Sequence, residues 1–195
     1  MVKKLLTTLI LLTTININTM ARFEQYKPLV LKWEGQFAGN IDGMICTMKG
    51  VTLATYRTYC KNKGLKRPNC NDLKNIPDAH WDEICKGMFW DKWKADSINS
   101  QSIAMLLVDW VWGSGTYGIK YPQQVLGVKV DGIVGPKTLA AINNYPNQKE
   151  LFDKLWQRRK KHFEDLAKSP SKKKFLKGWL NRLGDFKWVD DNQLA

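Results

Sequence analysis

The stretch SQSIAMLLVDWVWGSG, residues 100–115, is the most apolar part of the chain and decides what kind of fold surrounds it. Its apolar side chains recur at the spacing of a helix, and one face carries Ile103, Leu106, Leu107 and Trp110. Ser100 is a suitable N-cap for this helix. A helix that is apolar on most of its surface has to be covered by other elements. The stretch therefore predicts a buried central helix.

The sequence on both sides predicts further helices of amphipathic character. The predicted helices cover residues 22–34, 53–63, 121–126, 136–143, 147–168 and 171–183, and a further helix starts at Asp78. Thr52 is the expected cap of the helix over 53–63, and Asp78 caps the helix that is expected to bury Trp81, Ile84, Cys85 and Met88. The helix over 171–183 is expected to bury Phe175, Leu176, Trp179 and Leu180. Residues 36–50 indicate a loop or small hairpin, and residues 66–75 a connecting loop. No Pro- or Ser-rich linker separates these segments, so we expect a mainly α protein that forms one compact unit with two lobes.

The composition is that of a folded, strongly basic protein. Its 195 residues include 31 Lys and Arg against 18 Asp and Glu, a net charge of +13. Such a charge attracts anionic polymers: nucleic acid, anionic lipid or bacterial wall. No zinc-finger spacing or RNA-recognition motif is present, so nucleic acid is not an expected partner. The nine tryptophans suit either stacking on sugar rings or an aromatic core.

Residues 1–19, MVKKLLTTLILLTTININT, have the pattern of an export signal. Lys3 and Lys4 precede a short apolar run over residues 5–12, which is too short to span a membrane. No small-x-small cleavage site follows. We expect an exported protein of the periplasm or exterior; the alternative is a cytoplasmic, phage-type endolysin that starts at Met20.

The four cysteines lie within one forty-residue stretch, at Cys46, Cys60, Cys70 and Cys85. Their spacing contains no C-x-x-C and does not fit a zinc site. In an oxidising compartment they allow three pairings that the sequence does not distinguish, and in the cytosol they are buried thiols. We expect a structural role in either case.

Glu34 is the first candidate for chemistry. It ends a predicted helix beside Trp33 and before Gly35, and both the helix dipole and the aromatic neighbour favour a protonated carboxyl there. Such a carboxyl suits the protonation of a glycosidic oxygen. Asp42 and Thr47 follow in the loop, and Asp42 is placed to supply a second carboxylate across a cleft.

Two segments carry a family resemblance. WEGQF at 33–37 and DGMICTMKGVTLATYRTY at 42–59 resemble the opening of the glycoside hydrolase family 108 muramidases, whose catalytic glutamate corresponds to Glu34. The resemblance implies a lysozyme-like helical fold with a short loop or hairpin after the catalytic helix. It also implies cleavage of the β-1,4 bond between N-acetylmuramic acid and N-acetylglucosamine in peptidoglycan. The spacing is similar to that of phage lysozymes, in which a Glu, a loop Asp and a Thr form the site, although both gaps are one residue shorter here.

Three residues depart from the family pattern. Gln36, Met44 and Ile45 stand where the family has glycines. Their side chains are expected to narrow the cleft or to exclude positive-φ backbone that glycine permits. The departures leave open altered specificity or an inactive relative.

A second resemblance lies in DGIVGPKTLAAIN, residues 131–143, and continues into FLKGWLNR, residues 175–182. Both are similar to peptidoglycan-binding modules found in the C-terminal half of the same family. The motif residues are Asp131, Gly132, Gly135 and Thr138, for which we expect a turn and a helix start, with glycan contact secondary. The resulting organisation is a signal over 1–19, a catalytic lobe over 20–118 and a peptidoglycan-binding-like lobe over 119–195.

Several polar and aromatic residues between these segments are candidates for lining a glycan groove. They are Tyr56, Trp90, Trp93, Asp109, Trp112 and Ser114. Trp112, beside the glycines of 113–115, is the preferred one, whereas Trp110 continues the apolar face and is expected in the core.

Other hydrolase classes lack their motifs. The chain has two histidines and no H-E-x-x-H or G-x-S-x-G, and no metal or organic cofactor is expected. Two alternatives remain besides a muramidase: a lytic transglycosylase, which cuts the same bond without needing a second carboxylate, and a non-catalytic wall-binding or secretion-assisting protein. The sequence leaves the oligomeric state and the biological context open.

Overall fold

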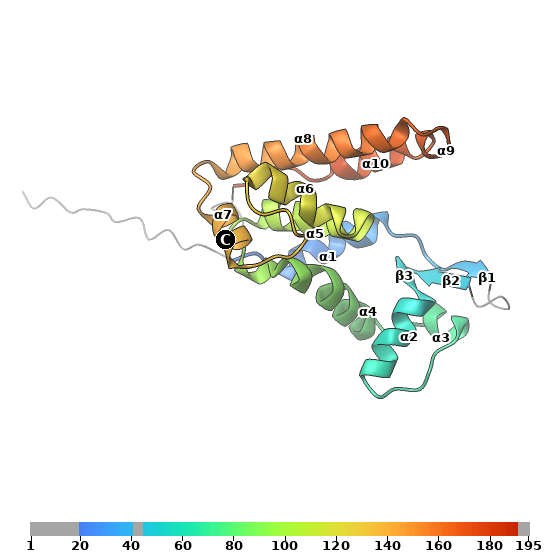
Figure 1. Ribbon diagram of the computed structural model, residues 1–195. Coiled ribbons are helices and arrows are strands. Elements are labelled where there is room, and N and C mark those ends of the chain that lie inside the picture. The colour runs from blue at the N-terminus through green and yellow to red at the C-terminus, as the bar shows by residue number, and fades with distance from the viewer. Residues whose placement is uncertain (1–19, 41–44, 191–195) are drawn as a thin grey trace, which may run out of the picture.

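The computed structural model describes residues 20–40 and 45–190. Figure 1 shows two parts: the strands gather with α2 and α3 at one end, and α1, α5, α6, α8 and α10 pack together in the other. Helix α4 leads from the first part into the second. The architecture is the mainly α, lysozyme-like fold that the sequence predicted. The signal predicted for residues 1–19 lies outside the described residues.

The elements follow one another in a simple order. The helices are α1 (Phe23–Trp33), α2 (Leu53–Asn62), α3 (Cys70–Lys74), α4 (Asp78–Cys85), η1 (Lys86–Trp90), η2 (Asp91–Trp93), η3 (Ala95–Ser97), α5 (Gln101–Ser114), α6 (Tyr117–Leu126), α7 (Pro136–Asn143), α8 (Gln148–Ala167), α9 (Pro170–Lys173) and α10 (Leu176–Gly184). The strands are β1 (Ala38–Asn40), β2 (Ile45–Met48) and β3 (Val51–Thr52). None of the helices in the described ranges is long and apolar enough to cross a membrane.

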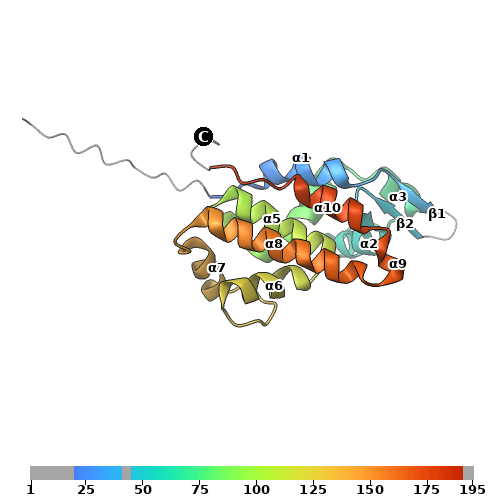
Figure 2. The ribbon, with the colours of Figure 1, turned by 90° about the horizontal axis from the view of Figure 1, so that it is seen from above.

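Helix α5 is the central element that its apolar sequence predicted. Its side chains from Gln101 to Ala104 and from Leu106 to Val111 are buried, and it packs against α6, α8 and η1. Figure 2 shows α8 and α10 side by side next to it. The Ser100 hydroxyl accepts a hydrogen bond from the Ile103 N–H, as the N-cap prediction requires.

The tryptophans mainly build this core. Trp81, Trp90, Trp93 and Trp110 are among the largest fully buried side chains. For these four of the nine tryptophans, the alternative of an aromatic core is therefore confirmed over that of sugar stacking.

The strands form a small antiparallel sheet in the order β1-β2-β3, which confirms the hairpin predicted within residues 36–50. Gly39 pairs with Cys46, and Thr47 pairs with Thr52. A disulfide joins Cys46 of β2 to Cys70 at the start of α3. Cys60 and Cys85 are buried free thiols. The four cysteines thus form one disulfide and two buried free thiols.

Three local predictions were wrong. Residues 66–75 are not only a loop, because Asn69 and Asp72 form a capping box that starts α3. Met88 is 47% exposed, because the chain widens into the π-helix η1 and turns Trp90, not Met88, into the core. The helix predicted over 171–183 is divided into α9 and α10 by a tight turn at Phe175, whose N–H bonds the Lys172 carbonyl, and Phe175 itself is 49% exposed.

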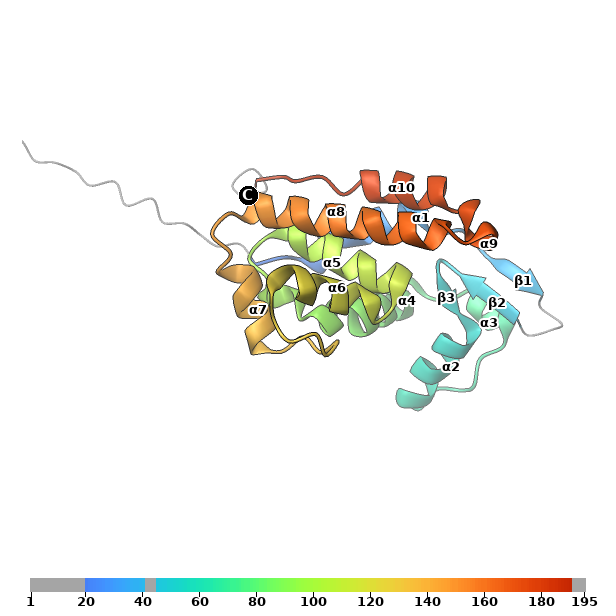
Figure 3. The ribbon, with the colours of Figure 1, turned by 45° about the horizontal axis from the view of Figure 1, so that its top comes forward.

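Helix α9 lies where the hairpin of α8 and α10 ends. In Figure 3 it lies toward the same end of the molecule as the sheet, and Figure 1 shows it well separated from the strands, next to α8 and α10.

Candidate active site

Glu34 occupies the position that ends α1. Its backbone has left the helix, with φ −86° and ψ 127°, while its N–H still bonds the Val30 carbonyl. This arrangement turns the side chain away from the helix and toward α5 and α10. The side chain is 13% exposed, so the carboxyl lies at the edge of the core rather than in bulk solvent.

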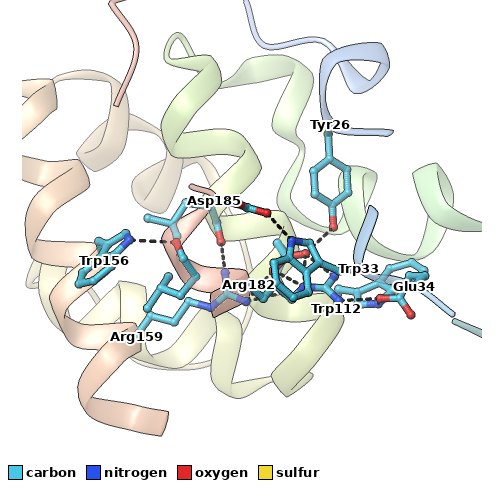
Figure 4. A network of polar contacts seen from close by, with 11 residues as sticks. Tyr26, Trp33, Glu34, Trp112, Trp156, Arg159, Arg182 and Asp185 are labelled. Atoms are coloured by element: carbon cyan, nitrogen blue, oxygen red, sulfur yellow. Dashed lines mark hydrogen bonds and ion pairs between the residues drawn. The ribbon is translucent and has the colours of Figure 1, made fainter. Parts of the chain in front are cut away.

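Two donors hold one oxygen of this carboxyl. Trp112 Nε1 donates to Oε1 of Glu34 at 2.6 Å, and Arg182 Nη1 donates to the same atom at 2.7 Å. Figure 4 shows Trp112, Arg182 and Glu34 meeting from three different elements. Among the described residues, no side chain or backbone group forms a hydrogen bond with Oε2. The carboxyl is therefore fixed through Oε1, while Oε2 has no hydrogen-bond donor within the described ranges.

Arg182 is itself clamped by a buried acid. Its Nη2 donates to Asp109 Oδ1 at 2.6 Å, and its Nε lies 3.1 Å from Asp109 Oδ2. Asp109 is fully buried on α5 and also accepts from Arg159 Nη2 at 2.6 Å and from the Tyr26 hydroxyl at 3.2 Å. Glu34 is thus the outer member of a network that reaches into the core.

Charge balance explains how this network remains ionised inside the protein. Burial disfavours the charged form of Asp109, but the adjacent guanidinium groups of Arg159 and Arg182 outweigh that effect and hold the pKa of Asp109 below its ordinary value. Burial opposes the charge on Arg182 as well, yet Asp109 and Glu34 together raise its pKa. Burial and the charge of Asp109 raise the pKa of Tyr26 well above its ordinary value, so Tyr26 remains a neutral donor.

The turn at residues 48–50 forms the wall opposite Arg182. Gly50 has φ +76°, and a Cβ at this position would lie 2.5 Å from Glu34 Oε2 and would also clash with the Trp112 ring. Lys49 anchors the turn, because its N–H bonds the Gly35 carbonyl and its own carbonyl accepts from Trp81 Nε1 at 2.9 Å. Only glycine fits between the turn and the carboxyl.

Trp112 is held in place by other rings. Its ring centroid lies 4.4 Å from that of Phe89 and 6.3 Å from that of Trp81. Contacts of this kind fix the plane of the indole, so the direction of its N–H toward Glu34 is set by packing.

The end of α10 is fastened to the end of α1. Asp185 accepts from Trp33 Nε1 at 2.6 Å and pairs with Lys32 at 2.6 Å, and Trp156 Nε1 on α8 donates to the Leu183 carbonyl at 3.1 Å. These contacts flank Arg182 on its own helix (Figure 4). They keep the arginine in register with Glu34.

The remaining predicted catalytic residues are placed only in part. Asp42 lies outside the described residues. Thr47 is a half-buried residue in the middle of β2, and no hydrogen bond joins its hydroxyl to Glu34 in the described ranges. Their predicted roles stay predictions.

Several groove predictions need correction. Trp90, Trp93 and Asp109 are 0% exposed and Tyr56 is 5% exposed, so none of them lines an open groove. The reason is that α5, η1 and η2 pack against one another and enclose the first three, while Tyr56 turns inward and bonds His80 Nδ1 at 3.0 Å. Ser114 is half-buried at the end of α5. Trp112 is the member of the set that reaches Glu34.

Two of the three residues that replace family glycines, Gln36 and Ile45, lie within the described part of the chain. Ile45 is 78% exposed on β2, and neither Gln36 nor Ile45 has a positive φ. The absence of positive φ agrees with the expectation that a side chain excludes this region, and its effect on specificity or activity stays a prediction. Met44 lies outside the described residues.

The second sequence motif builds a turn. Asp131 Oδ1 accepts from the Ile133 N–H at 2.9 Å, and Gly132, with φ +76°, donates its N–H to the buried Gln123 at 2.9 Å. Thr138 is 4% exposed on α7, and Gly135 precedes Pro136 with extended backbone. The turn and helix start expected of Asp131, Gly132, Gly135 and Thr138 are confirmed, while glycan contact by this motif stays a prediction.

Comparison with known proteins agrees with this geometry. Residues 28–115 match the family model of glycosyl hydrolase 108. The chain carries a glycosyl hydrolase 108 region. Residues 117–184 match a second model, described as a predicted peptidoglycan domain. Together the two matches support a glycoside hydrolase that acts on peptidoglycan.

A solved structure supports the same assignment. The structure of Brucella abortus SagA is similar to that of this chain, with a TM-score of 0.67 and 25% sequence identity, covering 84% of this chain and 90% of that one. No curated protein matches the sequence. Within the described residues, no group of three or more His, Cys, Asp or Glu side chains is arranged to hold a metal ion.

Sequence reasoning missed Gly50 and Arg182 as site residues. Both lie inside the segments that carry the family resemblance, yet neither has a chemistry that marks it in isolation. The available signal was the acidic Asp109 inside an otherwise apolar helix, because a buried carboxylate has to be paired with a cation.

Proposed function

We propose that this protein is an N-acetylmuramidase in which Glu34 is the general acid. It cleaves the β-1,4 bond between N-acetylmuramic acid and N-acetylglucosamine in peptidoglycan. The observation that carries the proposal is the carboxyl of Glu34, which is 13% exposed, held through Oε1 by Trp112 and Arg182, and free of hydrogen bonds at Oε2 within the described ranges. A general acid needs a fixed carboxyl with one oxygen within reach of the leaving group.

The proposed reaction is a hydrolysis. The proton on Glu34 passes to the glycosidic oxygen, and the bond from that oxygen to the anomeric carbon of N-acetylmuramic acid breaks. The oxygen of a water molecule bonds to that carbon, and the proton that the water loses restores the protonated form of Glu34 for the next cycle. In this proposal Asp42 orients the water or stabilises the positive charge that develops on the sugar, and Thr47 assists it. Both roles rest on the family resemblance.

We also propose that the protein acts outside the cytoplasm. Its polymer substrate lies there, and a cystine such as Cys46–Cys70 persists in oxidising compartments. The basic residues 3 and 4 followed by an apolar run support export.

The test is digestion of purified peptidoglycan with the chain from Met20 to Ala195 and with its Glu34→Gln variant, followed by mass spectrometry of the released fragments. We expect reducing N-acetylmuramic ends from the wild type, and at least about 10²-fold less product from the variant. Asp153→Asn, an equivalent change at an exposed carboxylate on α8, is the control and should retain full activity.

The other outcomes identify the alternatives. Anhydro ends from the wild type would assign a lytic transglycosylase. No product from either protein, with binding to insoluble peptidoglycan retained, would leave a wall-binding protein.

A further inference from the structure

The geometry points to Arg182 as a positioning residue: it fixes the Glu34 carboxyl so that Oε2 is the oxygen presented to the glycosidic bond. This inference rests on the proposed function and deepens it. It gives the C-terminal region, which matches a peptidoglycan domain, a part in the active centre itself.

The first step of the argument is the way in which Arg182 divides its donors. Nε and Nη2 face the buried Asp109, at 3.1 Å from Oδ2 and 2.6 Å from Oδ1, and Nη1 alone faces Glu34 at 2.7 Å. A guanidinium bound in this forked manner has lost its freedom to rotate. Arg159 and Tyr26 in turn hold Asp109. The position of Nη1 is therefore set by the core before any substrate arrives.

The second step is that both donors reach the same atom. Trp112 and Arg182 both donate to Oε1, so together they fix the rotation of the carboxyl about its last torsion. A donor on each oxygen would have blocked both. The observed arrangement leaves Oε2 without a donor among the described residues, and the absence of a side chain at Gly50 lets the turn pack beside it without displacing the carboxyl.

The third step concerns charge. Arg159 and Arg182 balance Asp109 and Glu34, so the site holds two cations and two anions within one connected set. Without Arg182, the negative charge of Asp109 would act on Glu34 without a cation between them. Arg182→Met therefore changes the net charge of this set by one unit, which a pH–activity profile can register.

The experiment compares Arg182→Met, Arg182→Lys and Trp112→Phe on a soluble peptidoglycan fragment, with kcat, KM, the pH profile and thermal unfolding measured for each. Arg67→Met, at an exposed arginine beyond α2, is the matched control. We expect Arg182→Met to lower kcat about 10²-fold, with KM within about threefold of the wild type, and to move the alkaline limb of the profile to higher pH. Arg182→Lys should lose less kcat and keep the wild-type limb, because it retains the charge.

Trp112→Phe supplies a variant that leaves every charge in place. It keeps an aromatic ring against Phe89 but removes the second donor to Oε1, so we expect a lowered kcat with an unmoved pH profile. Arg182→Met should bind insoluble peptidoglycan as the wild type does.

The inference is overturned if folded Arg182→Met or Arg182→Lys has the wild-type kcat. It is also overturned if activity falls only in proportion to the folded fraction with the pH profile unchanged, which would make Arg182 a structural residue. A wild-type protein that releases no product would instead reject the proposed function, so the two failures are distinguishable.

Discussion

At the scale of single residues, the network behind Glu34 depends on Asp109, a carboxylate with no access to solvent. Its folded-state pKa is lowered because Arg159 and Arg182 outweigh the effect of burial. A group of this kind stabilises the fold at pH values above its unfolded pKa of about 3.9, and that contribution is lost as the pH falls through the folded pKa. Acidification should therefore lower the free energy of unfolding through the loss of charge on Asp109.

We expect Asp109→Asn to lower the free energy of unfolding by about 3–5 kcal/mol at pH 7, because two buried guanidinium groups lose their anion. The difference from the wild type should begin to shrink below about pH 4, where Asp109 of the unfolded chain takes up a proton, and should shrink further as the pH falls toward the lowered folded-state pKa. Urea denaturation at pH 7, 5 and 3 measures it. A difference that stays constant across this range would contradict the assignment, and Asp165→Asn, at an exposed carboxylate, should show only a small effect throughout.

Glu34 and Trp112 could be predicted from the sequence because each stands beside a glycine that interrupts a helix. Arg182 and Gly50 could not, since their roles arise from contacts across 148 and 16 positions of the chain, which no local pattern encodes. The wrong assignments of Trp90, Trp93 and Asp109 have the same origin. Whether an aromatic or acidic side chain faces a groove or the core is decided by tertiary packing.

At the scale of elements, the cystine Cys46–Cys70 joins the small sheet to α3. It closes a loop with a sequence separation of 24 in a part of the molecule with short strands and a helix of five residues. Cross-linking a loop of this length stabilises a fold by about 3 kcal/mol.

We expect Cys46→Ser/Cys70→Ser to lower the urea midpoint, and we expect dithiothreitol to lower that of the wild type to the same value. The double variant should be insensitive to dithiothreitol. Cys60→Ser/Cys85→Ser, which alters the two buried thiols, should keep the sensitivity. A wild-type midpoint that does not respond to reductant would contradict the cystine.

Helix starts were the most predictable feature at this scale. Thr52, Ser100 and Pro136 all act where their cap or first-turn chemistry indicated. Helix α3 was missed because it has only five residues, which is too short for its apolar side chains to show a helical period. The division between α9 and α10 was missed because a single tight turn interrupts a helical pattern without breaking it.

At the scale of the whole molecule, the positive charge is unevenly balanced. Lys172, Lys173 and Lys174 are exposed and form no ion pair with any described residue, whereas Lys63, Lys149 and Lys154 are each paired with an acid. The unpaired run lies at and just after α9, between α8 and α10 (Figure 3). Its positive charge is not balanced by any described acid, so it is expected to attract an anionic wall polymer.

We expect Lys172→Gln/Lys173→Gln/Lys174→Gln to bind peptidoglycan several-fold more weakly and with a flatter dependence on salt between about 0.05 and 0.5 M. Lys63→Gln/Lys149→Gln/Lys154→Gln removes the same number of charges and should bind nearly as the wild type does. Sedimentation with insoluble peptidoglycan at several salt concentrations measures both. Equal weakening would show that only net charge matters.

The sequence predicted two lobes, and this division stays a prediction, whereas a contact between the two matched regions was not predicted. The predicted boundary near residue 118 stays a prediction, and the matched regions end and begin on either side of it, at 115 and 117. Yet α10 brings Arg182 to Glu34 across that boundary. The two regions therefore meet in one site. The two family models match residues 28–115 and 117–184 separately, so neither describes a contact between the regions.

That crossing has a consequence for how the protein is made. The glutamate is synthesised before its arginine partner, which follows 148 positions later. A ribosome that stops anywhere in between releases a chain with the acid but without the group that orients it. Incomplete products would then be poor wall-cutting agents, and the cell that makes the enzyme would be spared their activity.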